Sequence, residues 1–130
     1  MGTIGRSVAG ITVEQGKLFI ARRRPGGDMG EKWEFPGGKV ESGETDEEAL
    51  IREYAEELGV PITTGPLLGT ISFEHRGTRY LYAYQVYFEA HNFTLSEHTE
   101  WRWAGLEALE ELDFAGSDRQ LLPLLKARLL

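Results

Sequence analysis

Residues 33–60 combine a glycine-rich turn with a helix whose start, end and two faces can be read from the amino acids. Thr45 and Glu48 form a capping box, which marks the start of the helix. Gly59 suits the position just after a helix end, so we predict a helix from Asp46 to Leu58. At about 100° per residue, positions i, i+3 and i+4 share one face. That face carries three carboxylates beside an apolar stripe that faces the core; the carboxylates are Glu53, Glu56 and Glu57, and the stripe is Leu50, Ile51, Tyr54, Ala55 and Leu58.

Acidic residues on a helix are in most proteins a solvated face, so these carboxylates alone do not identify a metal site. The wider spacing is more specific, because Gly38 is followed by five residues, Glu44, seven residues and the run REYAEELGV over 52–60. This resembles the Nudix box, GX5EX7REUXEEXGU, in which U is aliphatic, and the chain is identified as a member of the Nudix superfamily. Tyr54 is the one departure, since an aliphatic residue is usual there. It puts one core contact in question but not the metal ligands.

The resemblance implies the Nudix fold, an α/β (α+β) architecture in which helices sandwich a mixed β-sheet, formed by a single domain over residues 1–130. It also implies Mg²⁺, for which Mn²⁺ can substitute, bound by the oxygen ligands that such hard cations prefer. The expected ligands are the Gly38 carbonyl and the carboxylates of Glu53, Glu56 and Glu57. Arg52 is expected to pair with Glu56 at i,i+4. Glu44 is expected to anchor the loop or to bind metal through water.

The string WEFPGGK at 33–39 is similar to one found in the MutT-like branch of the family, which acts on nucleotides. Pro36 ends a short strand, and the two glycines after it let the backbone approach a ligand; a plain tight turn would have the same pattern. By the resemblance, Lys39 contacts a phosphate. Glu34 and Phe35 are expected to bind or orient the substrate, with a structural role as the alternative for Glu34.

The composition limits what else the chain could do. Its 130 residues have room for one domain and one core, and 41% apolar with 27% charged residues is ordinary for a globular protein. A net charge of −7 argues against a nucleic acid polymer as partner, so a polyanionic substrate would need a metal ion. The chain has no cysteine, no apolar run of membrane-spanning length and no signal-peptide pattern, and we expect a cytoplasmic monomer or homodimer that does not bind membranes.

Two β-type runs at 7–13 and 17–22 are separated by a turn at Gly16, which predicts a hairpin. Three consecutive arginines follow at the strand end, before a flexible Pro-Gly-Gly segment. Such a cluster is often only solvated. In a chain this acidic, we expect Arg22 or Arg23 to bind the substrate's phosphates.

A second hairpin is predicted from the β-type runs 67–74 and 80–90, which are joined by a basic loop at 75–79. Their alternating aromatic residues suggest that one face of the sheet is buried and that the other lines a cleft. His75, His91 and His98 show no metal-ligand spacing. We interpret each of them as a surface residue or a neighbour of the substrate.

In MutT-like proteins, an acidic residue six positions before a tryptophan supplies a further metal ligand or the general base. Glu97 has this spacing to Trp103, and Glu100 is the competing candidate. A charged loop without catalytic function is the third interpretation.

The C-terminal part predicts a short amphipathic segment at 106–112 and a final helix that begins at a capping box, Ser117 with Gln120, and ends at Leu129. Asp118 aligns by resemblance with the residue that reads the base in MutT-like enzymes, which is asparagine in the 8-oxoguanine-specific form. An ionised carboxylate only accepts hydrogen bonds, whereas an amide also donates them. The aspartate at this position leaves the identity of the recognised base open and makes cytidine nucleotides serious alternative substrates.

By the resemblance, the chain is expected to be a Mg²⁺-dependent pyrophosphohydrolase that cleaves (deoxy)nucleoside triphosphates to nucleoside monophosphate and pyrophosphate. Its expected role is to clear 8-oxo-dGTP or a related modified nucleotide from the nucleotide pool, in support of DNA repair. The alternatives within the family are hydrolases of cytidine nucleotides, nucleotide sugars or dinucleoside polyphosphates. An alternative of another class is a non-catalytic domain that senses a nucleotide or binds a partner, although such a domain need not keep every glutamate.

Overall fold

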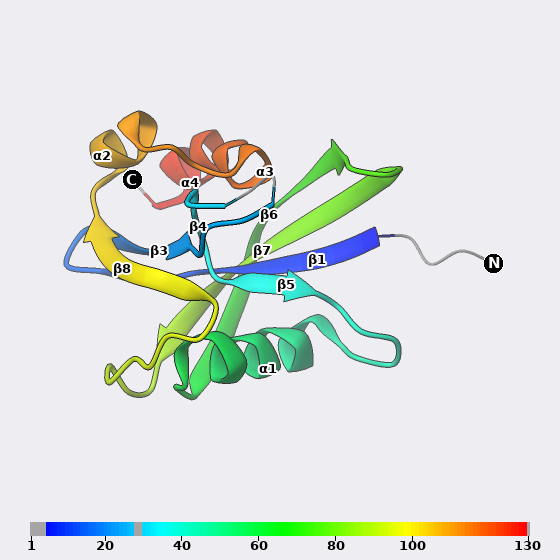
Figure 1. Cartoon of the computed structure of the whole chain (residues 1–130), viewed down its shortest axis with the longest axis horizontal. Helices are drawn as coiled ribbons and strands as arrows, with labels where there is room; N and C mark the ends of the chain where they lie inside the picture. The colour runs from blue at the N-terminus through cyan, green and yellow to red at the C-terminus, as the bar shows by residue number, and fades with distance from the viewer. Residues whose placement is uncertain (1–4, 28–29, 130) are drawn as a thin grey trace.

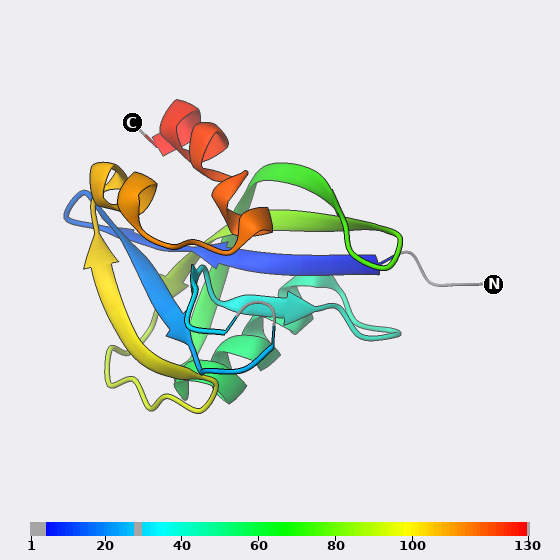
Figure 2. The same cartoon turned by 45° about the horizontal axis from the view of Figure 1, so that its top comes forward.

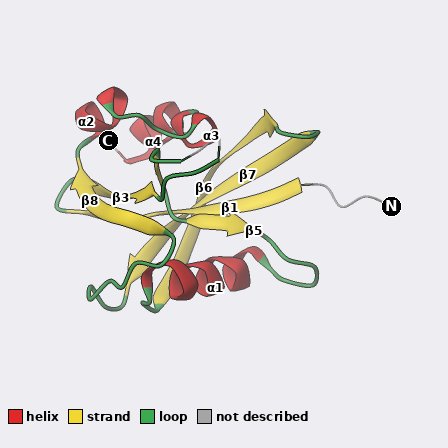
Figure 3. Ribbon diagram, in the orientation of Figure 1, coloured by secondary structure: helices red, strands yellow, loops and turns green. Residues whose placement is uncertain are grey.

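The computed structural model describes residues 5–27 and 30–129. The strands in these residues are β1 (Gly5–Ile11), β2 (Val13–Glu14), β3 (Lys17–Arg23), β4 (Trp33–Glu34), β5 (Gly37–Lys39), β6 (Ile62–Glu74), β7 (Thr78–Phe88) and β8 (His98–Ala104). The helices are α1 (Asp46–Leu58), α2 (Leu106–Glu111), α3 (Gly116–Arg119) and α4 (Leu122–Leu129). Figures 1 and 3 show α1 on one side of the strands and α2, α3 and α4 together on the other. The layers are those of the predicted α/β sandwich.

The strands form two sheets. In the first, the order is β5-β1-β7-β6, and β1 pairs with β7 in parallel while the other pairs are antiparallel. In the second, β2, β4 and β8 all pair antiparallel with β3. Figure 2 shows β8 running beside β3, apart from the long β6–β7 hairpin. The predicted mixed sheet is therefore present, with a second sheet beside it.

The N-terminal strands differ from the predicted hairpin. The run expected at 7–13 is divided at Thr12, whose hydroxyl donates a hydrogen bond to the Val86 carbonyl at 2.8 Å. Before this point β1 pairs with β5 and β7, and after it β2 pairs with β3. A change of sheet within one β-type run leaves no mark in the alternation of residues, so the pattern could not have predicted it. The second hairpin, β6–β7, is confirmed.

Helix α1 has the predicted bounds and caps. The Thr45 side chain accepts from the Glu48 N–H, the Glu48 side chain accepts from the Thr45 N–H, and Gly59 adopts the left-handed conformation at a φ of 69°. Tyr54, the departure from the Nudix pattern, is fully buried. It fits because β1 has a glycine opposite: a Cβ on Gly10 would lie 2.1 Å from the tyrosine hydroxyl oxygen.

The second capping box is not formed. The chain instead makes the short helix α3, which Ala115 precedes without a side-chain cap, and then α4. The Ser117 hydroxyl donates to the Asp118 carboxylate at 3.3 Å, and the Gln120 N–H donates to the Ser117 carbonyl at 3.2 Å rather than to that hydroxyl. Pro123 lies in the first turn of α4, where a helix tolerates proline.

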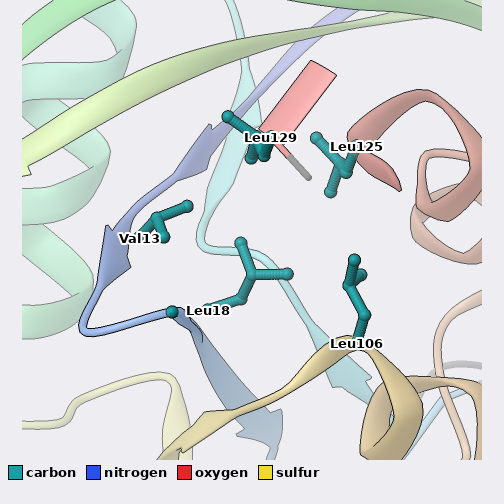
Figure 4. A pocket seen from close by; sticks show the side chains of 6 residues that line it. Val13, Leu18, Leu106, Leu125 and Leu129 are labelled. Atoms are coloured by element: carbon teal, nitrogen blue, oxygen red, sulfur yellow. The ribbon is translucent and has the colours of Figure 1, made fainter. Parts of the chain in front are cut away.

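Buried apolar side chains form two clusters, one beneath α1 and one beneath the C-terminal helices, where the sequence suggested one core. Helices on both sides of the strands account for the division. Figure 4 shows side chains from β2, β3, α2 and α4 that meet at the edge of the second cluster: Val13, Leu18, Leu106, Leu125 and Leu129. Of the leucines of α4, Leu122 and Leu125 are buried in this cluster, and Leu124 and Leu129 pack against it. Within the part of the chain that the structure describes, no helix is long and apolar enough to cross a membrane.

Candidate active site

The glycine turn before α1 brings the backbone against the helix carboxylates. A Cβ on Gly38 would lie 2.7 Å from the carboxylate carbon of Glu53, and one on Gly37 would lie 2.0 Å from the Val8 carbonyl oxygen. At Gly37 the β1 backbone leaves no room for a side chain, and at Gly38 a side chain would displace the Glu53 carboxylate. The Gly38 backbone thus lies beside Glu53, close to where the predicted carbonyl ligand would be needed.

Arg52 provides the positive charge on the exposed side of these carboxylates. Its Nε donates to Glu44 at 2.6 Å, and its Nη1 donates to Glu53 at 2.6 Å. The predicted pair with Glu56 is present at 3.4 Å. Nη2 also donates to the Lys39 carbonyl at 3.0 Å, which joins α1 to β5. The hydrogen bond from Arg52 lowers the pKa of Glu44 to about 2, and Glu44 therefore has the first of its two expected roles, as an anchor.

Glu57 is the buried member of the cluster, with 4% of the residue exposed. The side chains of Glu53 and Glu56 are 16% and 59% exposed. Burial, followed by a hydrogen bond with Glu53 and the negative charge of Glu34, raises the pKa of Glu57 to about 11. In the absence of a cation, these surroundings favour the protonated form of Glu57.

The donor atoms of these residues test whether the cluster fits a metal ion, and without a cation the buried Glu57 carboxyl group favours a bound proton. A divalent cation would take its place, because metal binding deprotonates its ligands and relieves the repulsion between neighbouring carboxylates. The donors are all oxygen atoms, which suits Mg²⁺ or Mn²⁺. The residues that would hold the ion are four of the five predicted ligands: Gly38, Glu53, Glu56 and Glu57. The fifth, Glu97, is predicted as either a further ligand or the general base.

A buried histidine, predicted to be either a surface residue or a neighbour of the substrate, lies against this cluster. His98 is 2% exposed at the start of β8. Its Nε2 lies 2.9 Å from a Glu34 oxygen and 3.8 Å from a Glu57 oxygen, close enough for the three side chains to hold a metal together. Its Nδ1 has no partner among the described residues, however, whereas a metal-bound histidine normally donates through its second nitrogen. We therefore interpret His98 as a support for Glu34 and Glu57. A single histidine has no spacing signal, so sequence reasoning missed it.

Glu97 and Glu100 have different surroundings. Glu97 is exposed in the loop before β8, next to His98, and within residues 5–27 and 30–129 its carboxylate makes no hydrogen bond or ion pair. Glu100 lies on β8, where the Nη1 of Arg22 donates to its carboxylate at 3.3 Å. The free carboxylate is thus that of Glu97, the residue that the spacing favours.

The arginines at the end of β3 point to different partners. Arg22 is engaged by Glu100, as described above. Arg23 donates through Nη1 to both carboxylate oxygens of Glu34, each at 3.3 Å. Arg23 also lines the pocket described next, whereas Arg22 does not. Of the two residues expected to bind substrate, Arg23 has the more suitable position.

A pocket of about 520 Å³ opens between the first sheet and α3. Its volume is in the range of small-molecule sites, which is about 300–1,000 Å³. Side chains from both hairpin strands, β1, β3, β5 and the α3 region line it: Ser7, Arg23, Lys39, Phe73, Glu74, His75, Arg79, Gly116, Ser117 and Gln120. Arg23, Lys39 and Arg79 give it positive charge in an otherwise acidic chain, and Phe73 gives it an aromatic wall.

Asp118 and Phe35 are joined beside this pocket. The backbone N–H of Phe35 donates to the Asp118 carboxylate at 2.7 Å, and the Phe35 ring is buried against Phe114 with ring centroids 5.2 Å apart. The ring of Phe35 is therefore a core group in this structure rather than an open contact for substrate.

The charge of Asp118 depends on its surroundings in the fold. Burial, and next the negative charge of Glu34, raises the pKa of Asp118 to about 8. Near neutral pH the protonated carboxyl group can donate one hydrogen bond while it accepts another, as an asparagine amide does. The sequence could not show this, because burial and Glu34 reach Asp118 only through the fold.

Comparison with known proteins gives the family of the chain. The NUDIX domain profile matches residues 2–125. The chain is 35% identical to the CTP pyrophosphohydrolase of Escherichia coli over 121 residues, covering 92% of this chain and 87% of that protein. It is 34% identical to the putative 8-oxo-dGTP diphosphatase 2 of Mycobacterium tuberculosis over 115 residues, covering 86% of this chain and 81% of that protein.

The fold also matches a solved structure, that of the MutT protein from Methanosarcina mazei Go1. The TM-score is 0.84 at 24% identity, over 98% of this chain and 96% of the other. An identity this low supports the shared fold alone. Together with the family match and the two relatives, it means that the chain belongs to the Nudix family, as a MutT-like pyrophosphohydrolase.

Proposed function

We propose that this protein hydrolyses nucleoside triphosphates to nucleoside monophosphate and pyrophosphate, with 8-oxo-dGTP or a related modified deoxynucleotide as its substrate, and thereby clears the nucleotide pool. The observation that carries the proposal is that one ion pair, between Arg23 and Glu34, connects an acidic cluster to a basic pocket. Arg23 lines the pocket and donates to Glu34, and Glu34 in turn lies against the buried cluster that includes Glu57.

Each part of the site has a separate task in this proposal. Bound Mg²⁺ would supply charge neutralisation at the phosphates and a more acidic water molecule. Glu53, Glu56, Glu57 and the Gly38 carbonyl hold it, and Arg52 fixes two of these carboxylates. Arg23 and Lys39 bind phosphate oxygens, since both cations lie at the pocket.

Glu97 accepts the proton of the attacking water. The water oxygen forms a bond to phosphorus, the bond from that phosphorus to the bridging oxygen breaks, and pyrophosphate leaves. Glu97 then releases the proton to solvent. Its exposed carboxylate, free of partners in the described residues, is able to take up this proton.

The rival substrate is CTP, and the relative named CTP pyrophosphohydrolase is the observation that favours it. The charge of Asp118 alone cannot discriminate between 8-oxo-dGTP and CTP. Its protonated form can donate a hydrogen bond to an acceptor on a base or accept one from a donor. Nucleotide sugars and dinucleoside polyphosphates remain rivals within the family.

The test is a panel of nucleotides, including 8-oxo-dGTP, dGTP, CTP, dCTP and dTTP, assayed for pyrophosphate and for phosphate release with Mg²⁺. We expect pyrophosphate as the inorganic product and the highest kcat/KM for 8-oxo-dGTP. Asp118→Asn should preserve the ranking below about pH 7 and change it by about tenfold above about pH 9, where the wild-type carboxylate is ionised. A highest kcat/KM for CTP would select the rival, and binding without turnover of any nucleotide would select the non-catalytic alternative.

A further inference from the structure

The C-terminal end of α1 is held by the loop that leads to Glu97. A helix leaves its last four carbonyl groups without partners inside the helix. Here Gly59 donates to the first of these, the Ala55 carbonyl, at 3.1 Å. The loop 89–97 satisfies the other three; the pairs are Ser96 Oγ to Glu56 O at 2.5 Å, Ser96 N to Glu57 O at 3.2 Å and Thr94 N to Leu58 O at 2.8 Å.

The same loop is held from the other side by the arginine that follows β3. The Nε of Arg24 donates to the Ser96 carbonyl at 2.8 Å, and the Arg24 N–H donates to the Glu97 carbonyl at 3.4 Å. Ser96 therefore uses its N–H, its hydroxyl and its carbonyl to connect the end of α1 with the end of β3. Figure 1 shows this loop beside the C-terminal end of α1.

These contacts surround the backbone of Glu97. Ser96, before it, bonds the backbone of Glu56 and Glu57, and His98, after it, lies against the side chains of Glu34 and Glu57. We propose that Ser96 and Arg24 are positioning residues, which hold Glu97 at a fixed place relative to the carboxylates of α1. This inference rests on the proposed function, in which Glu97 is the base.

Because Ser96 is exposed, its role in positioning Glu97 can be distinguished from a contribution to the stability of the fold. Ser96 is exposed, so water can replace its hydroxyl as the donor to the Glu56 carbonyl, and the net stabilisation from such a bond is small. Water cannot constrain the loop, however. Loss of the hydroxyl should therefore leave the fold intact and widen the range of positions open to Glu97. Catalysis should fall, because a small displacement of a catalytic group lowers the rate steeply.

The test is a double-mutant cycle between Ser96→Ala and Glu97→Gln. We expect Ser96→Ala to lower kcat by about tenfold in the wild-type background, with KM changed by less than about twofold. In the Glu97→Gln background it should have no further effect, because a residue that acts through Glu97 has nothing left to position. Ser96→Thr keeps the hydroxyl and should therefore have the kcat of the wild type. Arg24→Ala should lower kcat as Ser96→Ala does.

Ser72→Ala is the matched control, an exposed serine on β6 outside the loop. It should leave kcat unchanged. An equal loss from Ser96→Ala in both backgrounds would overturn the proposal, because the serine would then act on α1 directly. No loss in the wild-type background, or a loss that Ser96→Thr does not restore, would also overturn it.

A second readout does not depend on turnover. A carboxylate held beside the acidic cluster attracts a cation even when it is not a ligand. Mn²⁺ binding, followed by its electron paramagnetic resonance signal, should therefore weaken on Ser96→Ala in the wild-type background and stay unchanged in the Glu97→Gln background. If no nucleotide is turned over but this pattern holds, the proposed function fails and the positioning role stands. If turnover is normal and neither Mn²⁺ binding nor kcat shows the coupling, the positioning role fails and the function stands.

Discussion

Two buried carboxyl groups, Glu57 and Asp118, are the residues whose chemistry the fold changes most. Burial raises the pKa of both, to about 11 and to about 8, and Glu34 adds to the shift in each case. Glu34 itself is shared between Arg23 and His98. The protonation of the site is thus decided by a few side chains that come from distant parts of the sequence.

Asp118 gives a pH-dependent prediction about stability. Its pKa rises from an ordinary value of 3.8 to about 8 in the folded chain, so the folded state binds more protons than the unfolded state between these values. The stability that Asp118 contributes is therefore fully present below its unfolded pKa of 3.8, and it is lost as the pH rises through its folded pKa of about 8. Asp118→Asn stays neutral and can still accept from the Phe35 N–H.

We expect Asp118→Asn to match the wild type near pH 4 and to be more stable by at least about 1 kcal/mol above about pH 9. Thermal unfolding of both metal-free proteins across this range, followed by circular dichroism, measures the difference. A difference that does not change with pH would contradict the assigned shift.

At the scale of elements, the packing of α1 on β1 depends on the pair Tyr54 and Gly10. The tyrosine hydroxyl is buried and lacks a hydrogen-bond partner in residues 5–27 and 30–129, and the missing Cβ of Gly10 makes room for it. A tyrosine in an aliphatic position of the Nudix box is thus accommodated by a residue on another element.

We expect Tyr54→Phe to raise the free energy of unfolding by about 1 kcal/mol, because it removes a buried polar group without a partner. Gly10→Ala should lower it by about 2 kcal/mol or more through overpacking, but cost much less when combined with Tyr54→Leu. Urea unfolding of the wild type, Gly10→Ala, Tyr54→Leu and the double variant measures the coupling, and Tyr54→Phe is measured in the same way. Additive effects of Gly10→Ala and Tyr54→Leu would contradict the contact.

Local signals in the sequence were enough to predict α1, its caps and the β6–β7 hairpin, since capping boxes, left-handed glycines and β-type runs act within a few residues. They also predicted the pairing of Arg52 with Glu56. The change of sheet at Thr12, the burial of His98 and the partners of Arg22 and Arg23 all depend on contacts across the fold. The Ser117 capping box failed for the same reason, because α3 is so short that tertiary contacts decide its geometry.

At the scale of the whole molecule, metal binding should be coupled to stability. The folded chain brings the acidic cluster together and the unfolded chain does not, so a cation that binds the cluster stabilises the fold by mass action. Mg²⁺ at about a hundred times its dissociation constant should contribute about 2.7 kcal/mol. Differential scanning fluorimetry should show a Tm that rises with Mg²⁺ and returns to its starting value with EDTA.

Proton release should accompany the same event, since Glu57 exchanges a proton for the cation. Calorimetric titration of Mg²⁺ in buffers of different ionisation enthalpy counts these protons. A Tm that does not respond to Mg²⁺ would contradict the coupling.

The most direct test of the active site is Glu57→Gln, compared with Glu47→Gln as a control on the exposed face of the same helix. The substitution at Glu57 keeps the shape of the side chain and removes the charge that the cation needs. We predict that kcat for nucleoside triphosphate hydrolysis falls by at least about a hundredfold in Glu57→Gln, that Mn²⁺ binding weakens in parallel, and that Glu47→Gln matches the wild type. Full activity in the Glu57→Gln protein would contradict the assignment of this cluster as the active site.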